Sequence, residues 1–387
     1  MRLAVLASHP IQYQAPLFRA IARHLNLKVL FAHNAQGSDQ ASAGFGIPFE
    51  WDADLLSGYE YTFLRNISSR PGLDHFSGCD TPDIGMMLAS ERFDALLVMG
   101  WQLLSFLQGI YAAKRLHIPL MVRGDSQLAT PRSALKRAGK TFFYPRLLRF
   151  FDAALYVGTR SREYWLHYRY PEDRMFFSPH CVDNAWFADR ATVQARQQLR
   201  ALHNIPEETP ILLFAGKLLP FKRPLDVVYA TSMLNNCGIP ATMMIAGSGP
   251  LGGAIEEEAK RLRVRVVDLG FCNQTQMPSA YVAADILVLP SDGRETWGLV
   301  ANEALACGRP IVVSNSCGCA TDLAADGVAG SAYSTGDVTG LACVLEALLK
   351  KPPSLERIVA KISRYSTEAA ADGVFAALDR MQNKQMS

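Results

Sequence analysis

The stretch ILVLPSDGRETWGLVANEALACGRPIVV, residues 286–313, places two short apolar runs on either side of a polar loop and a segment rich in Ala and Leu. The first run, Ile286–Leu289, ends at Pro290, and the second, Ile311–Val313, begins directly after Pro310. The segment between them is long enough for a short helix after the loop. A strand, a helix and a second strand in this order predict a parallel βαβ unit covered on both faces.

The same alternation of apolar runs and helical patterns extends outward along the whole chain. In the second half we expect further strands at Ile211–Ala215, Thr242–Ala246 and Val264–Leu269. In the first half we expect strands at Arg2–Ala7, Lys28–Ala32, Ala95–Met99, Leu120–Val122 and Ala153–Val157. Two such series predict an α/β protein of two Rossmann-like, doubly wound domains that face a cleft. In such sheets ligands lie beyond the carboxyl ends of the strands.

The break between the two series lies near Asp183–Pro210, which contains the polar, charged stretch from Gln194 to Pro210. A length of 387 residues agrees with at least two domains, at about 150 residues each. We therefore predict a first domain over residues 1–190 and a second over residues 191–362.

The composition excludes several classes of protein. Hydrophobic residues make up 49% and charged residues 19% of the chain, which argues against disorder. A net charge of +3 is too small to indicate nucleic acid as the main partner. The eight cysteines form no CxxC pair, which argues against a disulfide scaffold and favours free thiols in a reducing cytoplasm.

Two apolar segments are candidates for a signal peptide and for a membrane span, and neither fits. The apolar run Leu3–Ala7 is too short for a signal peptide. Residues 95–113 carry no charge, but polar residues and glycines interrupt them, so we expect a buried strand followed by a helix rather than a span.

Cations and glycines follow two of the strands predicted in the second half. Gly216, Lys217 and Lys222 come after Ile211–Ala215 and can converge on phosphate oxygens, although an ordinary solvated basic turn has the same sequence. Gly247 and Gly249 follow Thr242–Ala246 and allow close approach of backbone to a ligand, or simply a tight turn. This pattern is not the GxGxxG of dinucleotide-binding enzymes, so a dehydrogenase is poorly supported.

Two glutamates seven residues apart are the most informative polar side chains. Glu295 lies in the loop after Ile286–Leu289, where it can face a polar ligand. Glu303 lies on a mostly apolar helix, where a buried carboxylate is costly unless a partner such as a ribose diol binds it. Alternatively, each carboxylate lies near a helix start only because the helix dipole stabilises negative charge there. This alternative is fair for Glu295 and poor for Glu303.

Together these motifs resemble the retaining nucleotide-sugar glycosyltransferases of family 4, which have the GT-B fold. The family's E-x7-E motif matches Glu295 and Glu303, and its G-x-G-P matches residues 247–250. Its Y-x-x-A-D-x-x-V-x-P-S matches residues 281–291, and its G-x-P-V-V matches residues 308–312. The resemblance covers residues 205–345. It implies that the second domain binds the nucleotide-sugar, that the first binds the acceptor, and that the C-terminal helix, residues 363–387, crosses back onto the first domain.

The resemblance also assigns roles residue by residue. Lys222 resembles the lysine that binds the donor diphosphate, and Lys217 stands where the family usually has arginine. Glu303 resembles the acid that holds the ribose hydroxyls, and Glu295 the acid that contacts the donor sugar. The donor-binding set that we predict is Gly216, Lys217, Lys222, Gly247, Gly249, Glu295, Leu299, Val300 and Glu303.

The first half contains fewer motifs of the family. His9, Gln12 and Tyr13 follow the first strand in place of the family's glycine-rich loop, and they are either cleft residues or part of a loop that caps the next helix. Many family members have a histidine after the strand at Leu120–Val122, but this chain has Gly124-Asp125. We predict that Asp125 contacts a sugar hydroxyl and belongs with Lys222 and Glu295 to the catalytic set, its alternative being a turn aspartate.

Residues 126–151 combine six Lys and Arg side chains with aromatic residues and contain no acid. Such a segment either docks onto anionic lipid headgroups or is a surface helix with one core face. The first 190 residues hold 21 Lys and Arg against 17 Asp and Glu, which fits an anionic surface on this half.

We therefore predict a metal-independent, retaining glycosyltransferase that needs no cofactor and moves a sugar from a UDP- or GDP-sugar to a carbohydrate or lipid-linked acceptor. The predicted location is the cytoplasm, at the inner face of the membrane if residues 126–151 bind lipid. The alternatives are a GT-B-like nucleotide-sugar epimerase and a non-catalytic nucleotide-sugar-binding module. No nucleic acid partner is expected.

Overall fold

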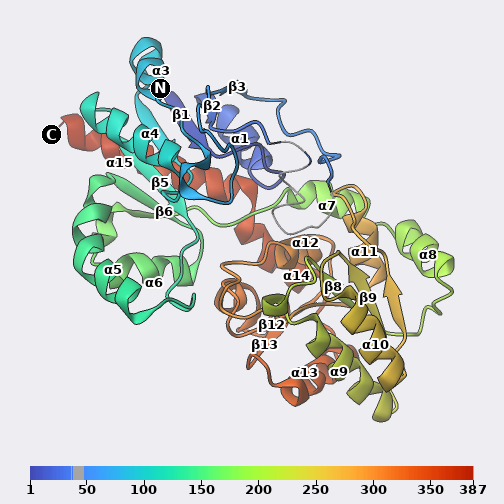
Figure 1. Cartoon of the computed structure of the whole chain (residues 1–387). Helices are drawn as coiled ribbons and strands as arrows, with labels where there is room; N and C mark the ends of the chain where they lie inside the picture. Colours follow the sequence, from blue (N-terminus) through green and yellow to red (C-terminus); the bar gives the residue numbers. More distant parts are fainter. Residues whose placement is uncertain (36, 38–47, 387) are drawn as a thin grey trace.

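The computed structural model describes residues 1–35, 37 and 48–386, and contains two parallel sheets, each wrapped by helices (Figure 1). In the described part of the first domain the sheet has the order β3-β2-β1-β4-β5-β6-β7. Its strands are β1 (Arg2–Ala7), β2 (Asn26–Phe31), β3 (Glu60–Phe63), β4 (Ala95–Val98), β5 (Leu120–Gly124), β6 (Ala153–Tyr156) and β7 (Met175–Phe177). Its helices are α1 (Ala15–Ala22), α3 (Ile84–Glu91), α4 (Leu104–Arg115), α5 (Ala134–Leu147) and α6 (Thr159–His167).

The second sheet has the order β10-β9-β8-β11-β12-β13. Its strands are β8 (Ile211–Ala215), β9 (Thr242–Ala246), β10 (Val266–Asp268), β11 (Ile286–Leu289), β12 (Ile311–Ser314) and β13 (Gly330–Tyr333). The helices that follow β7 are α7 (Asn184–Arg190), α8 (Val193–Leu202), α9 (Pro224–Asn236), α10 (Gly252–Leu262), α11 (Met277–Ala283), α12 (Val300–Ala306), α13 (Val338–Lys350), α14 (Leu355–Ile362) and α15 (Thr367–Met386).

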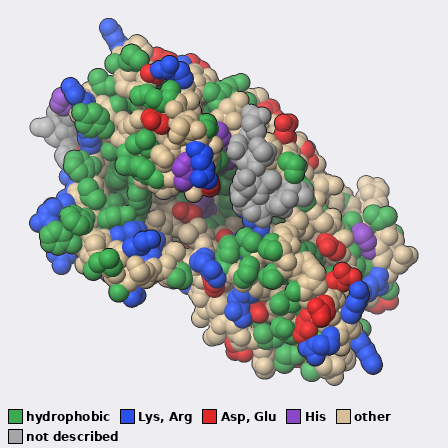
Figure 2. Space-filling view, viewed as in Figure 1, with side chains coloured by type: hydrophobic (Ala, Val, Ile, Leu, Met, Phe, Trp, Pro, Cys, Tyr) green, Lys and Arg blue, Asp and Glu red, His purple; other side chains and the backbone are tan. Residues whose placement is uncertain are grey.

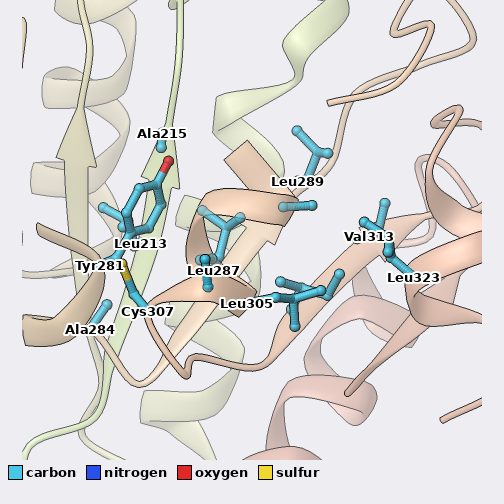
Figure 3. Packing of buried hydrophobic residues seen from close by; sticks show 14 of the residues in the cluster. Leu213, Ala215, Tyr281, Ala284, Leu287, Leu289, Leu305, Cys307, Val313 and Leu323 are labelled. Atoms are coloured by element: carbon cyan, nitrogen blue, oxygen red, sulfur yellow. The ribbon is translucent and has the colours of Figure 1, made fainter. Parts of the chain in front are cut away.

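Alternate side chains of the central strands enter separate cores on the two faces of each sheet, as expected for strands covered on both sides. In β8, Leu213 packs into one core and Leu212 into the other. The first of these cores contains Tyr281, which Figure 3 shows beside Leu213 and Ala215. This arrangement confirms the predicted pair of doubly wound α/β domains.

The chain order reverses beside β1 in the first sheet and beside β8 in the second, where β4 and β11 respectively pair on the other side. Loops diverge on the two sides of such a switch point and leave a crevice at the carboxyl ends of the strands. The residues that follow β1, β8 and β11 are therefore positioned for a ligand.

The last helix returns to the first domain, as predicted. Helix α15 packs against α1, β6 and β7, and its buried residues Val374 and Leu378 join the core of the first sheet. Helix α7, which we had included in the first domain, packs instead against α11 and α12, and Phe187 is buried in the second domain's core. The uncharged residues 95–113 form β4 and most of α4, as expected.

Candidate active site

A cavity of about 400 Å³ opens between the two domains at the carboxyl ends of the second sheet. Figure 2 shows a hollow between the two domains. Most of its walls come from loops after β8, β9 and β10 and from helix α12. The first domain contributes Gln12 and Trp51. The cavity thus lies where the topology places a ligand site, and both domains line it.

The floor of the cavity is formed by two loops that interlock through their backbones. Gly216 N donates to Ala246 O at 2.9 Å, and Leu218 N donates to Ser248 O at 2.8 Å. A Cβ on Gly247 would lie 1.9 Å from Gly216 O, so only glycine fits there. Gly249 has φ +150° and lies against the backbone of Leu218, which explains the second glycine by packing alone.

Two lysines, Lys217 and Lys222, line the cavity. Lys222, in the short 3-10 turn Pro220–Lys222, forms an ion pair with Glu295, which also accepts a hydrogen bond from Ser291 Oγ at 3.2 Å. Burial, together with the nearby charge of Lys222, lowers the pKa of Lys217. The loop after β8 therefore supplies two cations, and the loop after β11 supplies the Glu295 carboxylate beside them.

Glu303 projects from α12 into the same cavity. Burial raises the pKa of Glu303 to about 7, although the Tyr281 hydroxyl donates to its Oε2 at 2.5 Å and offsets part of that effect. Burial also raises the pKa of Tyr281 well above its usual value, so this hydroxyl remains a donor. A carboxylate held at this cost is suited to accept hydrogen bonds from a ligand.

Asp125 lies directly after β5 and contacts the second domain. Its Oδ2 accepts a hydrogen bond from Thr296 Oγ1 at 2.6 Å and lies 3.7 Å from His180 Nε2. Desolvation alone would raise the pKa of Asp125, but the His180 and Thr296 contacts outweigh it and lower this pKa to about 2. Asp125 is therefore ionised at physiological pH, and its side chain contacts Thr296 of the second domain.

The loop after β1 reaches this region with two of its three predicted residues. Gln12 lines the cavity, and the Tyr13 ring meets the His180 ring edge-on at a centroid distance of 6.0 Å. Burial and the Asp125 charge raise the pKa of Tyr13 to about 12. His9 bonds to Ser8 Oγ through Nδ1 at 3.0 Å. Gln12 thus lines the cavity wall, whereas Tyr13 lies beside His180, which contacts Asp125.

The cavity brings together Gly216, Lys217, Lys222, Gly247, Val300, Glu303 and Gln12. Within the described residues, its lining does not include Gly249, Glu295, Leu299, Asp125, His9 or Tyr13. It does include residues outside the predicted site sets: Trp51, Phe187, Leu219, Phe221, Phe271, Cys272, Gln274 and Met277. Phe271 and Cys272 follow β10 closely, so the rule that ligands lie at strand ends could have found them.

Comparison with known proteins agrees with this geometry. Residues 195–365 match the model of a family described as glycosyl transferases group 1. The D-inositol 3-phosphate glycosyltransferase of Mycolicibacterium smegmatis is 30% identical over 191 residues, which are 47% of this chain and 41% of that protein. The chain spans about half the length of the curated relatives that it matches.

Solved structures match almost the whole chain. Anabaena HepE in complex with UDP superposes with a TM-score of 0.74 at 16% identity, over 98% of this chain and 100% of that one. A glycosyltransferase from Rickettsia africae superposes with a TM-score of 0.75 at 12% identity, over 98% of each chain. The chain has the GT-B fold. In this GT-B protein the family match contains Lys217, Lys222, Glu295 and Glu303. Among the described residues, none of the helices is both long and apolar enough to cross a bilayer.

Proposed function

We propose that this protein transfers a sugar from a nucleotide-diphosphate donor, UDP-linked first and GDP-linked second, to an acceptor hydroxyl. The observation that carries the proposal is that Lys217, Lys222 and Glu303 line one cavity between two GT-B domains. Two cations suit a diphosphate, and an acid suits the two hydroxyls of a ribose.

The lysines would stabilise the negative charge that develops on the leaving diphosphate, the main electrostatic contribution that we assign to this site. Lys222 already holds Glu295 in an ion pair, so a bound diphosphate would share this cation. Glu295 would then turn one oxygen toward the donor sugar, the role that its place in the E-x7-E motif suggests.

Asp125 would act from the first domain, across the cleft from the donor. It is a fixed negative charge, because the contacts from Thr296 and His180 keep it ionised. Such a charge can hold a sugar hydroxyl or stabilise positive charge on the anomeric carbon. We infer front-face displacement with retention, in which the donor phosphate oxygen accepts the acceptor proton as the C–O bond to the diphosphate breaks and the new C–O bond forms.

Similar proteins support a nucleotide-sugar donor. Solved structures of Anabaena HepE hold UDP, UDP with glucose, and UDP-glucose, and they share the fold of this chain. The E-x7-E acids and the lysines of this chain lie inside the family match. No observation favours the epimerase or the non-catalytic module over transfer.

The test is release of nucleoside diphosphate from a panel of UDP- and GDP-sugars, with and without a panel of sugar and glycolipid acceptors. We expect release that depends on an acceptor, persists in EDTA, and falls by at least about 100-fold in Lys222→Ala. Conversion of the donor without acceptor would indicate the epimerase. Donor binding with no turnover under any condition would indicate the binding module, and either result overturns the proposal.

We also propose that the first domain docks on an anionic membrane surface through α5. The helix has no buried residue, and Leu135, Phe142 and Phe143 each expose more than half of their surface. Figure 2 shows Lys and Arg side chains gathered with hydrophobic ones over this part of the first domain. Half-buried Tyr144 packs against the core of the first domain, so α5 keeps one face toward the domain while Phe142 and Phe143 remain exposed. The cations around exposed aromatic side chains match anionic headgroups above an apolar boundary.

Vesicle flotation of the full chain tests this docking. We expect binding to vesicles with anionic lipid, weak binding to neutral vesicles, and loss of binding in Phe142→Ser with Phe143→Ser. Phe76→Ser is the matched control, because Phe76 is similarly exposed on another part of the first domain. Equal flotation of the double variant and the wild type, or no flotation with anionic vesicles, would contradict the docking.

A further inference from the structure

A first-domain segment crosses the cleft and contacts the second domain at one end of the cavity. Asn273 Nδ2 donates to Glu50 O at 2.7 Å, and Thr275 N donates to Asp52 Oδ1 at 3.2 Å. The Thr275 hydroxyl also donates to Asp52, and the rings of Phe49 and Phe271 lie 4.2 Å apart. In Figure 1 the blue chain after β2 reaches toward the second domain. We call residues 49–52 and 271–275 the clasp.

The clasp lies at the end of the cavity away from the predicted diphosphate site. Phe271, Cys272 and Gln274 follow β10, the outermost strand of the sheet on that side, whereas Lys222 follows β8 in the middle. If the lysines hold the diphosphate and Glu303 the ribose, the nucleobase reaches the β10 end. This assignment rests on the proposed function.

The chemistry of that end suits a flat, polar-edged ring. Trp51 and Phe271 contribute aromatic surface, and Met277 contributes an apolar wall. Gln274 also lines the cavity, and its buried Oε1 has no hydrogen-bond partner among the described residues. Aromatic faces stack on bases, and a side-chain amide can pair with the donor and acceptor groups on the edge of a base.

We propose that Trp51 of the first domain binds the nucleobase of the donor, together with Gln274 of the second domain, and that Asp52 holds Trp51 in place. The second domain alone would then form an incomplete nucleotide site. Base recognition would require the two domains to be clasped, so donor binding and domain closure would favour each other.

The test compares UDP with pyrophosphate, which has no base, by calorimetric titration of the full chain. Trp51→Ala should weaken UDP binding by about tenfold or more and leave pyrophosphate binding unchanged. Gln274→Ala should act in the same direction. Tyr111→Ala, which removes an exposed aromatic ring from α4, is the matched control and should change neither affinity. Trp51→Phe retains a stacking ring and should keep most of the affinity if the Ala variant folds poorly.

Asp52 is a positioning residue, so its test needs a readout from Trp51 itself. We expect UDP to change the tryptophan fluorescence of the wild type, to leave that of Trp51→Phe unchanged, and to produce a much smaller change in Asp52→Ala. If the wild type binds neither UDP nor pyrophosphate, the proposed function fails. If it binds UDP and Trp51→Ala binds UDP equally well, the nucleobase site fails while the proposed function stands.

Discussion

Glu303 is a carboxylic acid whose charge the folded protein disfavours before a ligand arrives. Burial raises its pKa to about 7, so near neutral pH about half of the ligand-free molecules carry it protonated. Ribose hydroxyls bind best to the ionised form. Donor affinity should therefore increase as the pH rises through 7. Below this pH, part of the binding free energy is used to ionise Glu303.

We predict that the affinity for UDP-glucose falls about tenfold from pH 8 to pH 6, since the ionised fraction of a group with pKa 7 changes by this amount. UDP-glucose is the suitable ligand because its diphosphate diester has no ionisation of its own in this range. Glu303→Gln should bind more weakly at pH 8 and show a flat profile. A wild-type profile that is equally flat in calorimetric titrations would contradict the role of Glu303.

Asp125 is the residue on which a catalytic contribution from the first domain depends. Because its pKa is lowered to about 2, Asp125→Asn removes a charge that is present throughout the working pH range. We expect kcat to fall about 100-fold in Asp125→Asn and about tenfold in Thr296→Val, which loses only the hydrogen bond. UDP affinity should stay within about twofold, because Asp125 does not line the donor cavity. Steady-state rates with normal kcat in Asp125→Asn would remove it from the catalytic set.

At the scale of single residues, the sequence could predict site residues that closely follow a strand, but not those that lie elsewhere. Lys217, Lys222 and Gly247 follow strands closely, and all three line the cavity. The contact of Asp125 with Thr296 depends on how two domains meet, which no local pattern encodes. Trp51 lies in a long connection between β2 and β3, so no strand end pointed to it.

At the scale of elements, the interlocked loops after β8 and β9 form the floor of the cavity. A Cβ at Gly249 would lie 2.8 Å from Leu218 N, in a backbone conformation with φ +150°. We predict that Gly249→Ala destabilises the protein by about 1–3 kcal/mol in urea unfolding.

Gly253→Ala is the matched control for this loop. Gly253 lies in α10, and a Cβ there meets nothing within 4 Å, so the substitution should stabilise by about 0.5–1 kcal/mol. Equal effects of the two substitutions would contradict the proposed packing of the glycine loops.

The interior strands could be predicted because both of their faces are apolar, and β1, β8, β9 and β11 have the predicted bounds. The predicted strands did not include β3, β7 and β13. Residues Glu60 and Tyr61 of β3 are exposed, as is usual for an edge strand, and β7 spans only Met175–Phe177. Edge strands lack the continuous apolar run on which the prediction relied.

At the scale of the whole molecule, α15 follows the second domain in the chain but packs on the first domain. The first domain's core is therefore completed by residues from the end of the chain. Gly373 allows this helix to lie on β7, because a Cβ there would be 2.0 Å from Phe177 O. We predict that Gly373→Ala lowers the free energy of unfolding by about 2 kcal/mol or more, whereas Gly139→Ala on exposed α5, where a Cβ meets nothing within 4 Å, does not. Equal unfolding midpoints would show that α15 tolerates a looser fit.

The two sheets could be predicted because each has its own series of apolar runs, whereas the crossing of the C-terminal helix was implied by the resemblance to GT-B glycosyltransferases. The contacts between the domains were not predicted. Asp322 illustrates why: it accepts hydrogen bonds from the Thr159 backbone N–H and hydroxyl, on a helix of the other domain. Such pairs are far apart in the chain and have no shared pattern.

The central claim is that the cavity between the domains holds a nucleoside diphosphate donor. Its most direct test is calorimetric titration of the purified chain with UDP, GDP and ADP, with and without magnesium. We predict micromolar binding of UDP, or failing that GDP, independent of magnesium and reduced at least tenfold in both Glu303→Ala and Lys222→Ala. Absence of binding to all three nucleotides, or binding that both variants leave unchanged, would contradict the claim.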